Sequence, residues 1–332
     1  MSPLGQAAIF LAAAVVAVPL SKRLGLGSVL GYLGAGMIIG PQLLDLAGDV
    51  DSILHFAEYG VVLLLFIIGL ELQPSRLWVL RKTVFGLGSA QVFFTGVLLA
   101  VAARVLGLGW TTALIAGFGL AMSSTAFALQ LLAEKQQLTA QHGRAAFAIL
   151  LFQDLAVIPL LAALTLLSPQ AATGEPTSAW LAALKVAATL AAVVISGRYL
   201  LRPILRMVAA TRIHELFTAM TLLVVVFTSL AMEFAGLSLA LGAFLAGVLL
   251  AESEYRRELE ADIEPFKGLL LGLFFMAVGM SVNFGLIGEK PLTIAGLVVA
   301  LVVIKAAVMF ALARAFGKEA RPAYALAVVL SQ

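Results

Sequence analysis

Long apolar runs recur along the whole of this sequence, and they limit what the chain can fold into. A run of roughly 17 to 25 apolar residues is long enough to cross the hydrocarbon core of a bilayer as a helix. Hydrophobic residues make up 62% of the chain and charged residues 12%, whereas charged residues make up roughly 25% of ordinary soluble domains. The sequence therefore predicts an all-α polytopic membrane protein embedded in a lipid bilayer.

The runs can be counted if shorter, Gly-rich ones are accepted where protein buries them. On this count we predict twelve spans, the last of them incomplete. They cover approximately residues 5–20, 26–41, 53–72, 84–106, 111–133, 145–167, 179–200, 214–232, 236–251, 266–282, 291–316 and 322 onward.

The positive charges alternate between the two sides of these spans. Of the 21 Lys and Arg residues, 17 fall on one side, in loops and flanks that include Lys22, Arg81, Arg144, Arg206 and Arg256. By the positive-inside rule these loops are cytoplasmic, and the N-terminus of this multi-pass protein lies on the outer side of the cell (inner) membrane. The calculated pI of about 9.3 then reflects orientation, and we expect no nucleic-acid partner.

Two segments in the chain resemble each other. Gly25 to Gly36 and Gly236 to Gly247 agree at six of twelve positions, and two later pairs of segments follow in the same order. For any single pair, the alternative explanation is that Gly, Ala and Leu coincide by composition. The copies are seven spans apart, an odd number, so they cross the membrane in opposite senses, as in many secondary transporters. We predict inverted repeats at roughly 5–167 and 214–332, joined by a linker span at 179–200.

One carboxylate interrupts the apolar run 145–167. Asp154 follows Gln153 there, and insertion scales put the cost of Asp at a helix centre at roughly 2.5 to 3.5 kcal/mol. A desolvated carboxylate can be neutralised by a proton or by a cation, so Asp154 is the candidate site for both. The alternative is a structural pairing with a basic residue. Because Gln153 is neutral, the site has a single titrating group. One cation should therefore exchange for about one proton, so we predict electroneutral exchange.

Further polar residues interrupt other spans. Ser123, Ser124 and Thr125 lie in the middle of one span, and Ser331 and Gln332 lie in the last. Hydroxyls and freed carbonyls at an unwound helix can coordinate a cation, although Ser and Thr within spans also bond to backbone or to a neighbouring helix.

Lys305 is a basic residue with apolar neighbours on both sides in the span 291–316. An ammonium in hydrocarbon needs a partner, and Asp154 is the carboxylate that we place well inside a span. We therefore predict a salt bridge between them, either permanent or broken whenever a cation takes Asp154.

The segment Phe152 to Pro159, together with Ser123 to Ala126, resembles the membrane domain of the monovalent cation:proton antiporter-2 family. Leu250 to Arg256 and Asp262 to Phe275 resemble the Kef-type glutathione-regulated potassium efflux transporters within it. The resemblance covers essentially the whole chain. It implies a thirteen-span fold, a dimerising scaffold, a mobile core with two crossed broken helices, and potassium-for-proton exchange by an elevator-like movement.

The resemblance also implies roles for particular residues. Potassium and the proton would bind at Asp154, with Gln153 and the segment Ser123 to Thr125 beside it, and Lys305 would be the membrane-embedded lysine. Relatives continue beyond the position of Gln332 into the rest of the second broken helix, a final span and a cytoplasmic nucleotide-binding domain. We expect nucleotide and glutathione to bind only there, with no cofactor in this chain and with a soluble regulatory subunit as a further partner.

A charged segment before the tenth predicted span is the candidate regulatory loop. It contains Arg257, Leu259, Glu260 and Asp262, and it departs in part from the Kef-type pattern His-Ala-Leu-Glu-Ser-Asp. Alternating charges suit docking against a soluble domain that biases the membrane core. A solvated loop without that role is the alternative.

Other functions remain open from the sequence. A sodium/proton antiporter or a ligand-gated monovalent cation channel is the nearest rival, because spacing does not set ion size selection. A structural or sensory membrane module is a further alternative. We do not expect an enzyme, because an intramembrane aspartyl protease needs two facing carboxylates and Asp154 alone qualifies.

Overall fold

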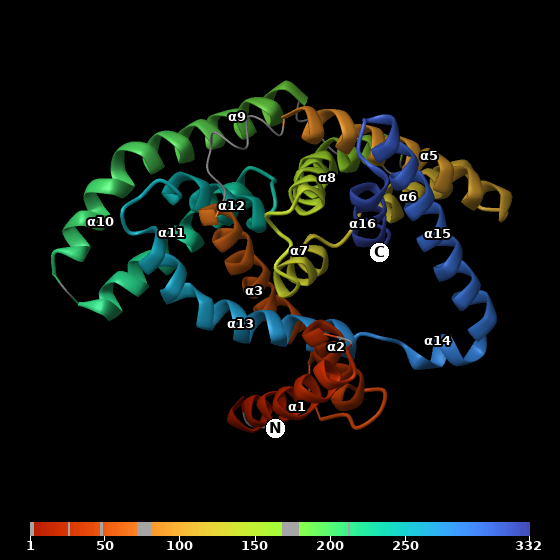
Figure 1. Ribbon diagram of the computed structural model, residues 1–332, viewed down its shortest axis with the longest axis horizontal. Helices are drawn as coiled ribbons and strands as arrows, with labels where there is room; N and C mark the ends of the chain where they lie inside the picture. The colour runs from red at the N-terminus through yellow and green to blue at the C-terminus, as the bar shows by residue number, and fades with distance from the viewer. Residues whose placement is uncertain (1–2, 26, 47–48, 72–80, 168–178, 212) are drawn as a thin grey trace. The chain divides into compact units, whose positions relative to one another are not determined.

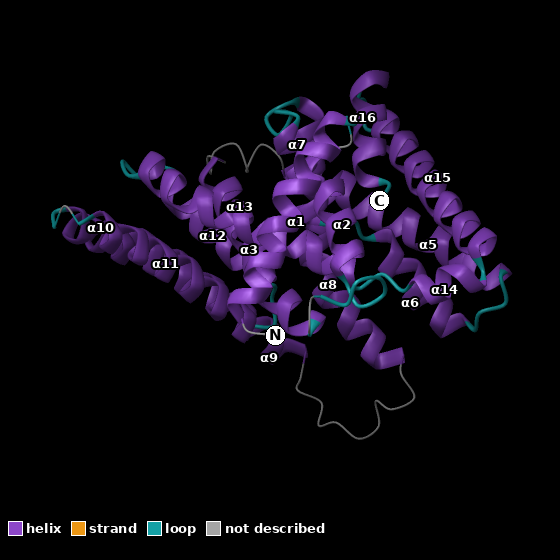
Figure 2. Cartoon of the chain, turned by 90° about the horizontal axis from the view of Figure 1, so that it is seen from below, coloured by secondary structure: helices purple, strands orange, loops and turns teal. Residues whose placement is uncertain are grey.

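The computed structural model describes residues 3–25, 27–46, 49–71, 81–167, 179–211 and 213–332. Within these ranges the regular elements are helices joined by turns and loops, with no strand (Figure 2). The all-α prediction is therefore confirmed. The last residue of the predicted span 53–72 lies outside the described residues.

Most of the helices are long and apolar, as a bilayer requires. Eight segments of the described chain have the length and composition to cross a membrane, and three shorter apolar helices accompany them. The long helices include α1 (Pro3–Arg23), α3 (Val50–Glu71), α9 (Ala179–Ser196), α11 (His214–Phe234), α13 (Arg256–Met280) and α15 (Pro291–Ala315).

Shorter elements complete the described chain. The apolar ones are α2 (Gly27–Ile39), α12 (Leu239–Leu250) and α16 (Ala320–Leu330). Two π-helical segments, η1 (Thr83–Gly88) and η2 (Gly197–Leu201), continue into α5 (Ser89–Val105) and α10 (Arg202–Ala209), and α14 (Phe284–Glu289) precedes α15.

One predicted span is interrupted where its polar residues predicted a break, and another begins earlier than expected. The span at 111–133 is two helices, α6 (Trp110–Ala121) and α7 (Thr125–Glu134). The span at 266–282 begins ten residues earlier, because α13 starts at Arg256 and includes the charged segment that we predicted as a loop. Its Arg, Glu, Leu and Ala residues all favour a helix, and charge alone does not interrupt one.

The chain forms two compact units, each built from two separate stretches. The first comprises residues 1–76 and 176–284, and the second comprises residues 77–175 and 285–332. In the first unit α3 packs against α12 and α13, and α2 packs against α13 (Figure 1). Its core is apolar and includes Phe66, Leu70, Leu205, Leu250 and Ile263.

Glycines let the helix backbones of the first unit approach closely. A Cβ on Gly36 would lie 2.0 Å from the carbonyl oxygen of Met276, and one on Gly247 would lie 2.1 Å from that of Phe66. In the sequence match Gly36 corresponds to Gly247, and Phe66 and Met276 are equally spaced from their own copies' Gly69 and Gly279. Each close contact of one repeat thus has a counterpart in the other.

A second pair of contacts follows the same exchange. A Cβ on Gly69 would lie 2.3 Å from the carbonyl oxygen of Phe244, and one on Gly279 would lie 2.2 Å from that of Leu33. The packing of α2 on α13 therefore has its counterpart in the packing of α12 on α3, as expected for an internal repeat. The outer boundaries of the repeats stay a prediction.

The second unit holds the candidate site residues of the broken helices. In it α5 packs on α6, α15 packs on α16, and α8 (Gln141–Leu167) contacts η1, α16, α5, α7 and α6. Gly117 allows the close approach of α5 and α6, since a Cβ there would lie 2.5 Å from the backbone nitrogen of Ala100. These contacts place α8 against the interruption between α6 and α7.

Candidate functional site

The site is built around the three-residue break between α6 and α7. Met122 and Ser124 adopt extended backbone conformations, with ψ of 154° and 110°. Ser124 is the N-cap of α7, and its Oγ accepts a hydrogen bond of 3.3 Å from the backbone N–H of Phe127. Such a cap satisfies one of the free donors at a helix start. A break inside an apolar segment exposes backbone groups that must find other partners.

The end of α16 supplies partners for this break. Ser123 Oγ donates to the carbonyl oxygen of Leu330 at 2.8 Å, and Gln332 Nε2 donates to the carbonyl oxygen of Ser124 at 3.1 Å. Ser331 is buried, and its hydroxyl donates to the carbonyl oxygen of Val328 in its own helix. The structure therefore brings together the two polar segments that the sequence singled out.

Lys305 on α15 has partners other than the one predicted. It is 2% exposed, and its Nζ donates to the carbonyl oxygen of Met122 at 2.6 Å and to that of Gln332. No ion pair joins it to Asp154, so the predicted direct salt bridge is absent from this structure. The carbonyls at the C-terminal end of a helix carry partial negative charge and accept hydrogen bonds from a cation. The ammonium is thereby satisfied by backbone.

Asp154 lies on α8 and is half-buried. Its one described hydrogen bond comes from the hydroxyl of Thr125, which is 3.4 Å from Oδ1. That distance makes a weak hydrogen bond. The carboxylate oxygens can therefore still bind a proton or a small cation.

Gln153 lies next to Asp154 on α8 and is 2% exposed. Its Oε1 accepts from the backbone N–H of Ser123 at 2.9 Å, and its Nε2 donates to Oε1 of Gln91 at 2.7 Å. Gln91 and its neighbour Thr95, both buried in α5, were not among the predicted site residues. An amide in the middle of an apolar span is the signal that would have found Gln91.

The residues predicted as a regulatory loop lie instead in the first turns of α13. Leu259 is fully buried in the apolar core of the first unit, whereas Arg257 is exposed and Glu260 is half-buried. The helical spacing turns successive residues to different sides, so the four do not share one exposed surface. The prediction of a loop is therefore wrong.

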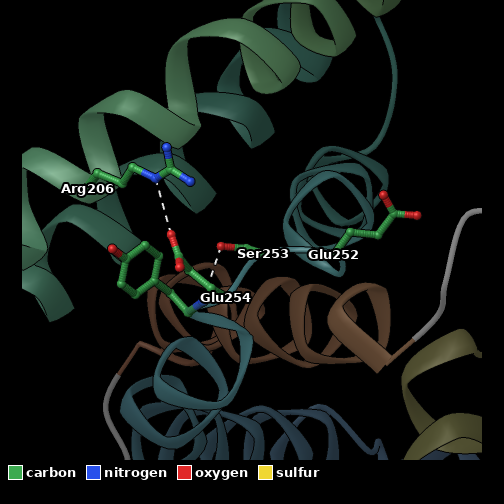
Figure 3. Close-up of a pocket in the computed structure, with 5 residues that line it drawn as sticks. Arg206, Glu252, Ser253 and Glu254 are labelled. Atoms are coloured by element: carbon green, nitrogen blue, oxygen red, sulfur yellow. Dashed lines mark hydrogen bonds and ion pairs between the residues drawn. The ribbon is translucent and has the colours of Figure 1, made fainter.

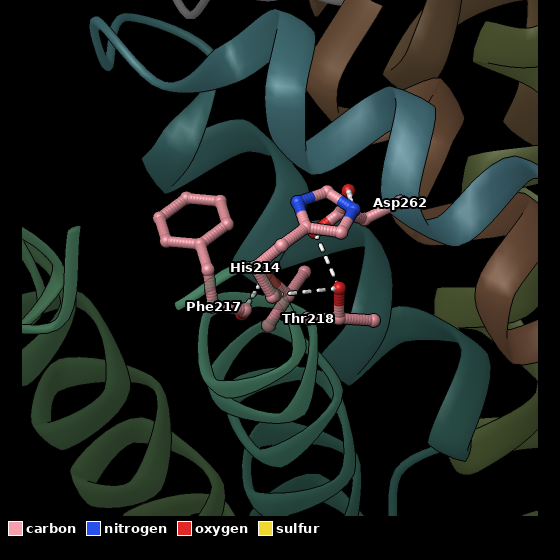
Figure 4. Close-up of polar contacts among 5 residues, drawn as sticks. His214, Phe217, Thr218 and Asp262 are labelled. Atoms are coloured by element: carbon pink, nitrogen blue, oxygen red, sulfur yellow. Dashed lines mark hydrogen bonds and ion pairs between the residues drawn. The ribbon is translucent and has the colours of Figure 1, made fainter. Parts of the chain in front are cut away.

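Asp262 connects α13 to the start of α11. Its carboxylate is buried, with Oδ1 3.3 Å from Nε2 of the exposed His214. Thr218 Oγ1 donates to its Oδ2 at 2.8 Å (Figure 4). The role of Asp262 in this structure is to join two helices of the first unit.

A polar pocket of about 190 Å³ lies before the start of α13 in the first unit. It is lined by Arg206, Glu252, Ser253, Glu254 and Tyr255. Arg206 Nε donates to Glu254 Oε1 at 3.2 Å across it (Figure 3). Both side chains are largely exposed, so this ion pair contributes little to stability.

Comparison with known proteins finds a family and a relative that match most of this chain. Residues 10–332 match the family model described as sodium/hydrogen exchanger, transmembrane. The chain is 54% identical over 330 residues to the glutathione-regulated potassium-efflux system protein KefC of Klebsiella pneumoniae. The match covers 98% of this chain and 53% of that protein, so the chain spans about half the length of the curated relative.

A solved structure has the same fold. The sodium proton antiporter MjNhaP1 from Methanocaldococcus jannaschii, determined at pH 8, superimposes with a TM-score of 0.68 over 98% of this chain and 83% of its own, at 16% identity. The resemblance to Kef-type transporters and the antiporter fold inferred from the sequence are both confirmed. With a family match over nearly its entire length, the chain belongs to the sodium/hydrogen exchanger family of transmembrane proteins.

Proposed function

We propose that this protein exchanges potassium for protons across the cell inner membrane, with both ions binding in turn at Asp154. The similar protein from Klebsiella is named as a potassium-efflux protein, which supports potassium as the cation. The observation that carries the proposal is the contrast within the site. Most of the neighbouring polar groups have protein partners, whereas the Asp154 carboxylate has one weak hydrogen bond.

The cation would bind mainly to Asp154 and to the hydroxyl oxygen of Thr125. The carbonyl oxygens of Met122, Ser124 and Leu330 already accept hydrogen bonds from Lys305, Gln332 and Ser123. Water or a second lone pair on these carbonyls would complete the coordination. Potassium is here the substrate, and a bound proton excludes it because each neutralises the same carboxylate.

The exchange is proposed to be electroneutral. Gln153 is neutral, and the charge of Lys305 is held by helix-end carbonyls, which leaves Asp154 as the titrating group of the broken-helix site. One cation then replaces one proton. A membrane potential imposed on proteoliposomes should leave the exchange rate unchanged, and a potential-dependent exchange current would refute this stoichiometry.

We also propose an elevator-like movement of the second unit, which holds the broken helices, during each exchange cycle. The break before Thr125 is hydrogen-bonded to α16 and α15, and Gln153 beside Asp154 is hydrogen-bonded to the same break, which supports movement as one body. The orientation with the N-terminus outside, a homodimeric assembly and regulation by a soluble subunit or a nucleotide- and glutathione-binding region are further parts of the proposal.

The direct test is Asp154→Asn. The amide cannot release a proton or supply a negative charge, so potassium-driven proton movement in proteoliposomes should fall to background. The matched control is Asp51→Asn, which changes an exposed carboxylate at the start of α3 and should leave exchange unchanged. Full exchange by Asp154→Asn would refute the assignment of the site.

Sodium/proton exchange is the second candidate, because the family description and the solved structure both name sodium. The two are separated by comparing proton movement driven by equal gradients of potassium, rubidium and sodium. Faster exchange with sodium would favour the second candidate. Cation flux that needs no opposing proton gradient would favour a channel.

A further inference from the structure

Gln91 and Gln153 close a ring of hydrogen bonds across the break between α6 and α7. Gln91 Nε2 donates to the carbonyl oxygen of Ala121 at 3.1 Å and lies 3.3 Å from Thr95 Oγ1. Gln91 Oε1 accepts from Gln153 Nε2 at 2.7 Å, and Gln153 Oε1 accepts from the backbone N–H of Ser123 at 2.9 Å. The ring thus runs from Ala121 through both side chains to Ser123, two residues further along.

Backbone groups at the two ends of this ring determine the orientation of both amides. A carbonyl oxygen can only accept, so Ala121 requires the nitrogen end of Gln91. A backbone N–H can only donate, so Ser123 requires the oxygen end of Gln153. With both ends set, the oxygen of Gln91 meets the nitrogen of Gln153. Reversal of one amide would bring like groups together in a buried site, which is unfavourable.

The ring has a consequence for the neighbouring carboxylate. Gln153 precedes Asp154, and its side-chain oxygen accepts from the backbone N–H of Ser123 in the break. Thr125, whose hydroxyl donates to Asp154, follows two residues later. If the Gln153 amide were free to reverse, its NH₂ group would face the break and place partial positive charge where a cation binds. Gln91, on α5, prevents that reversal by accepting a hydrogen bond from Gln153 Nε2. No described hydrogen bond joins Gln91 to Asp154 itself.

We propose that Gln91 is a positioning residue for the exchange reaction: it fixes the amide of Gln153 and thereby keeps the break between α6 and α7 in its cation-binding form. This inference rests on the function proposed above, because it names a further residue for that same site. It assigns to α5 a role in cation affinity.

Gln91→Met tests this role, since it keeps the length of the side chain and removes its hydrogen bonds to Ala121, Thr95 and Gln153. We expect KM for potassium to rise about tenfold, the effect of losing one net hydrogen-bond energy, with kcat changed by less than about twofold. The control is Gln130→Met on α7, whose Nε2 donates to Glu134 in its own helix; its KM should stay at the wild-type value. A fall in kcat with unchanged KM would overturn the proposal in favour of a purely structural role.

A double-mutant cycle tests whether Gln91 acts through Gln153. If it does, Gln91→Met combined with Gln153→Met should have the KM of Gln153→Met alone, within about twofold. Multiplied effects of the two substitutions would show that they act independently and would contradict the positioning role. Thr95→Val is a milder variant for use if Gln91→Met does not fold, and it should raise KM by about two- to threefold.

Hydrogen exchange separates failure of this inference from failure of the proposed function. The amide of Ser123 is held by Gln153, so Gln91→Met should speed its exchange by about tenfold, whether or not the protein transports potassium. Wild-type protein without potassium/proton exchange would refute the proposed function alone. If the backbone N–H of Ser123 exchanges equally slowly in Gln91→Met, Gln91 does not fix the Gln153 amide. That result would refute this inference even if transport by the wild type is normal.

Discussion

The two units are stabilised by different kinds of contact. In the first, helix backbones meet at glycines and the core is apolar, with Gly36, Gly69, Gly247 and Gly279 in reciprocal contacts. In the second, the central contacts are hydrogen bonds among amides, hydroxyls, an ammonium and freed backbone groups. Close packing specifies one arrangement of helices. A polar network determines where an ion can bind. It destabilises the fold wherever one of its buried members loses its hydrogen-bond partner.

The largest expected effect concerns the glycine contacts of the first unit. Gly247→Ala would place a Cβ 2.1 Å from the carbonyl oxygen of Phe66, so α12 and α3 must separate, at a cost of about 3 kcal/mol in the free energy of unfolding. Thermal unfolding in detergent measures this. Gly268→Ala is the matched control on α13, where a Cβ meets nothing within 4 Å. It should raise stability by up to about 1 kcal/mol.

Equal behaviour of these two glycine variants would break the comparison, because it would mean that close backbone approach does not stabilise the first unit. Gly36→Ala extends the test to the other repeat. Its Cβ would lie 2.0 Å from the carbonyl oxygen of Met276, and the reciprocal packing predicts a loss of similar size.

The next effect concerns the buried ammonium of the second unit. Lys305→Met leaves the carbonyl oxygens of Met122 and Gln332 without this donor, and we expect a loss of about 2 kcal/mol. Lys290→Met, an exposed position at the start of α15, is the control and should be nearly neutral.

The same variant sharpens the finding on the missing ion pair. Because no described ion pair or hydrogen bond joins Lys305 to Asp154, the stability changes of Lys305→Met and Asp154→Asn should add to within about 0.5 kcal/mol. A large interaction energy between the two substitutions would instead support a direct salt bridge.

A smaller effect compares the same kind of helix cap in both units. Ser124 caps α7 in the second unit and Ser238 caps α12 in the first, each by a hydrogen bond to the N–H three residues on. Replacement of either by Ala should cost about 1 kcal/mol in thermal unfolding experiments. The exchange assay distinguishes them, since Ser124→Ala should also raise KM for potassium and Ser238→Ala should not. A changed KM for Ser238→Ala would contradict this division.

The smallest effect is a pH dependence at the start of α3. A hydrogen bond from Ser52 Oγ, 2.5 Å from Oδ2, lowers the pKa of Asp49 below its ordinary value of 3.8. Because the folded pKa is the lower one, the contribution of Asp49 to stability is present above about pH 4 and is lost as the pH falls through the folded value. Asp49→Asn should lower Tm by less than about 2 °C at pH 7, and by less at pH 3, where the wild type loses this contribution itself, as thermal scans at the two pH values would show.

Polar residues inside apolar runs were the part of the site that the sequence could predict. Asp154, Lys305 and the segment from Ser123 to Thr125 stand out because charged and hydroxyl groups are rare at such positions. Gln91 carries the same signal, but a single amide does not reveal its partner. Its charge makes the start of α13 resemble a loop in the sequence, whereas in the structure Leu259 and Asp262 are buried on a helix.

By itself, the sequence predicted that the chain is helical, that apolar spans recur along it with related segments, and that one acid interrupts an apolar run. These follow from composition and from period, which are local properties. The tertiary structure alone decided that Lys305 bonds to helix ends and that Gln91 closes the ring beside Asp154. The reason is physical: the partners are backbone carbonyls and N–H groups, which every residue carries and which become distinctive only where a helix is interrupted.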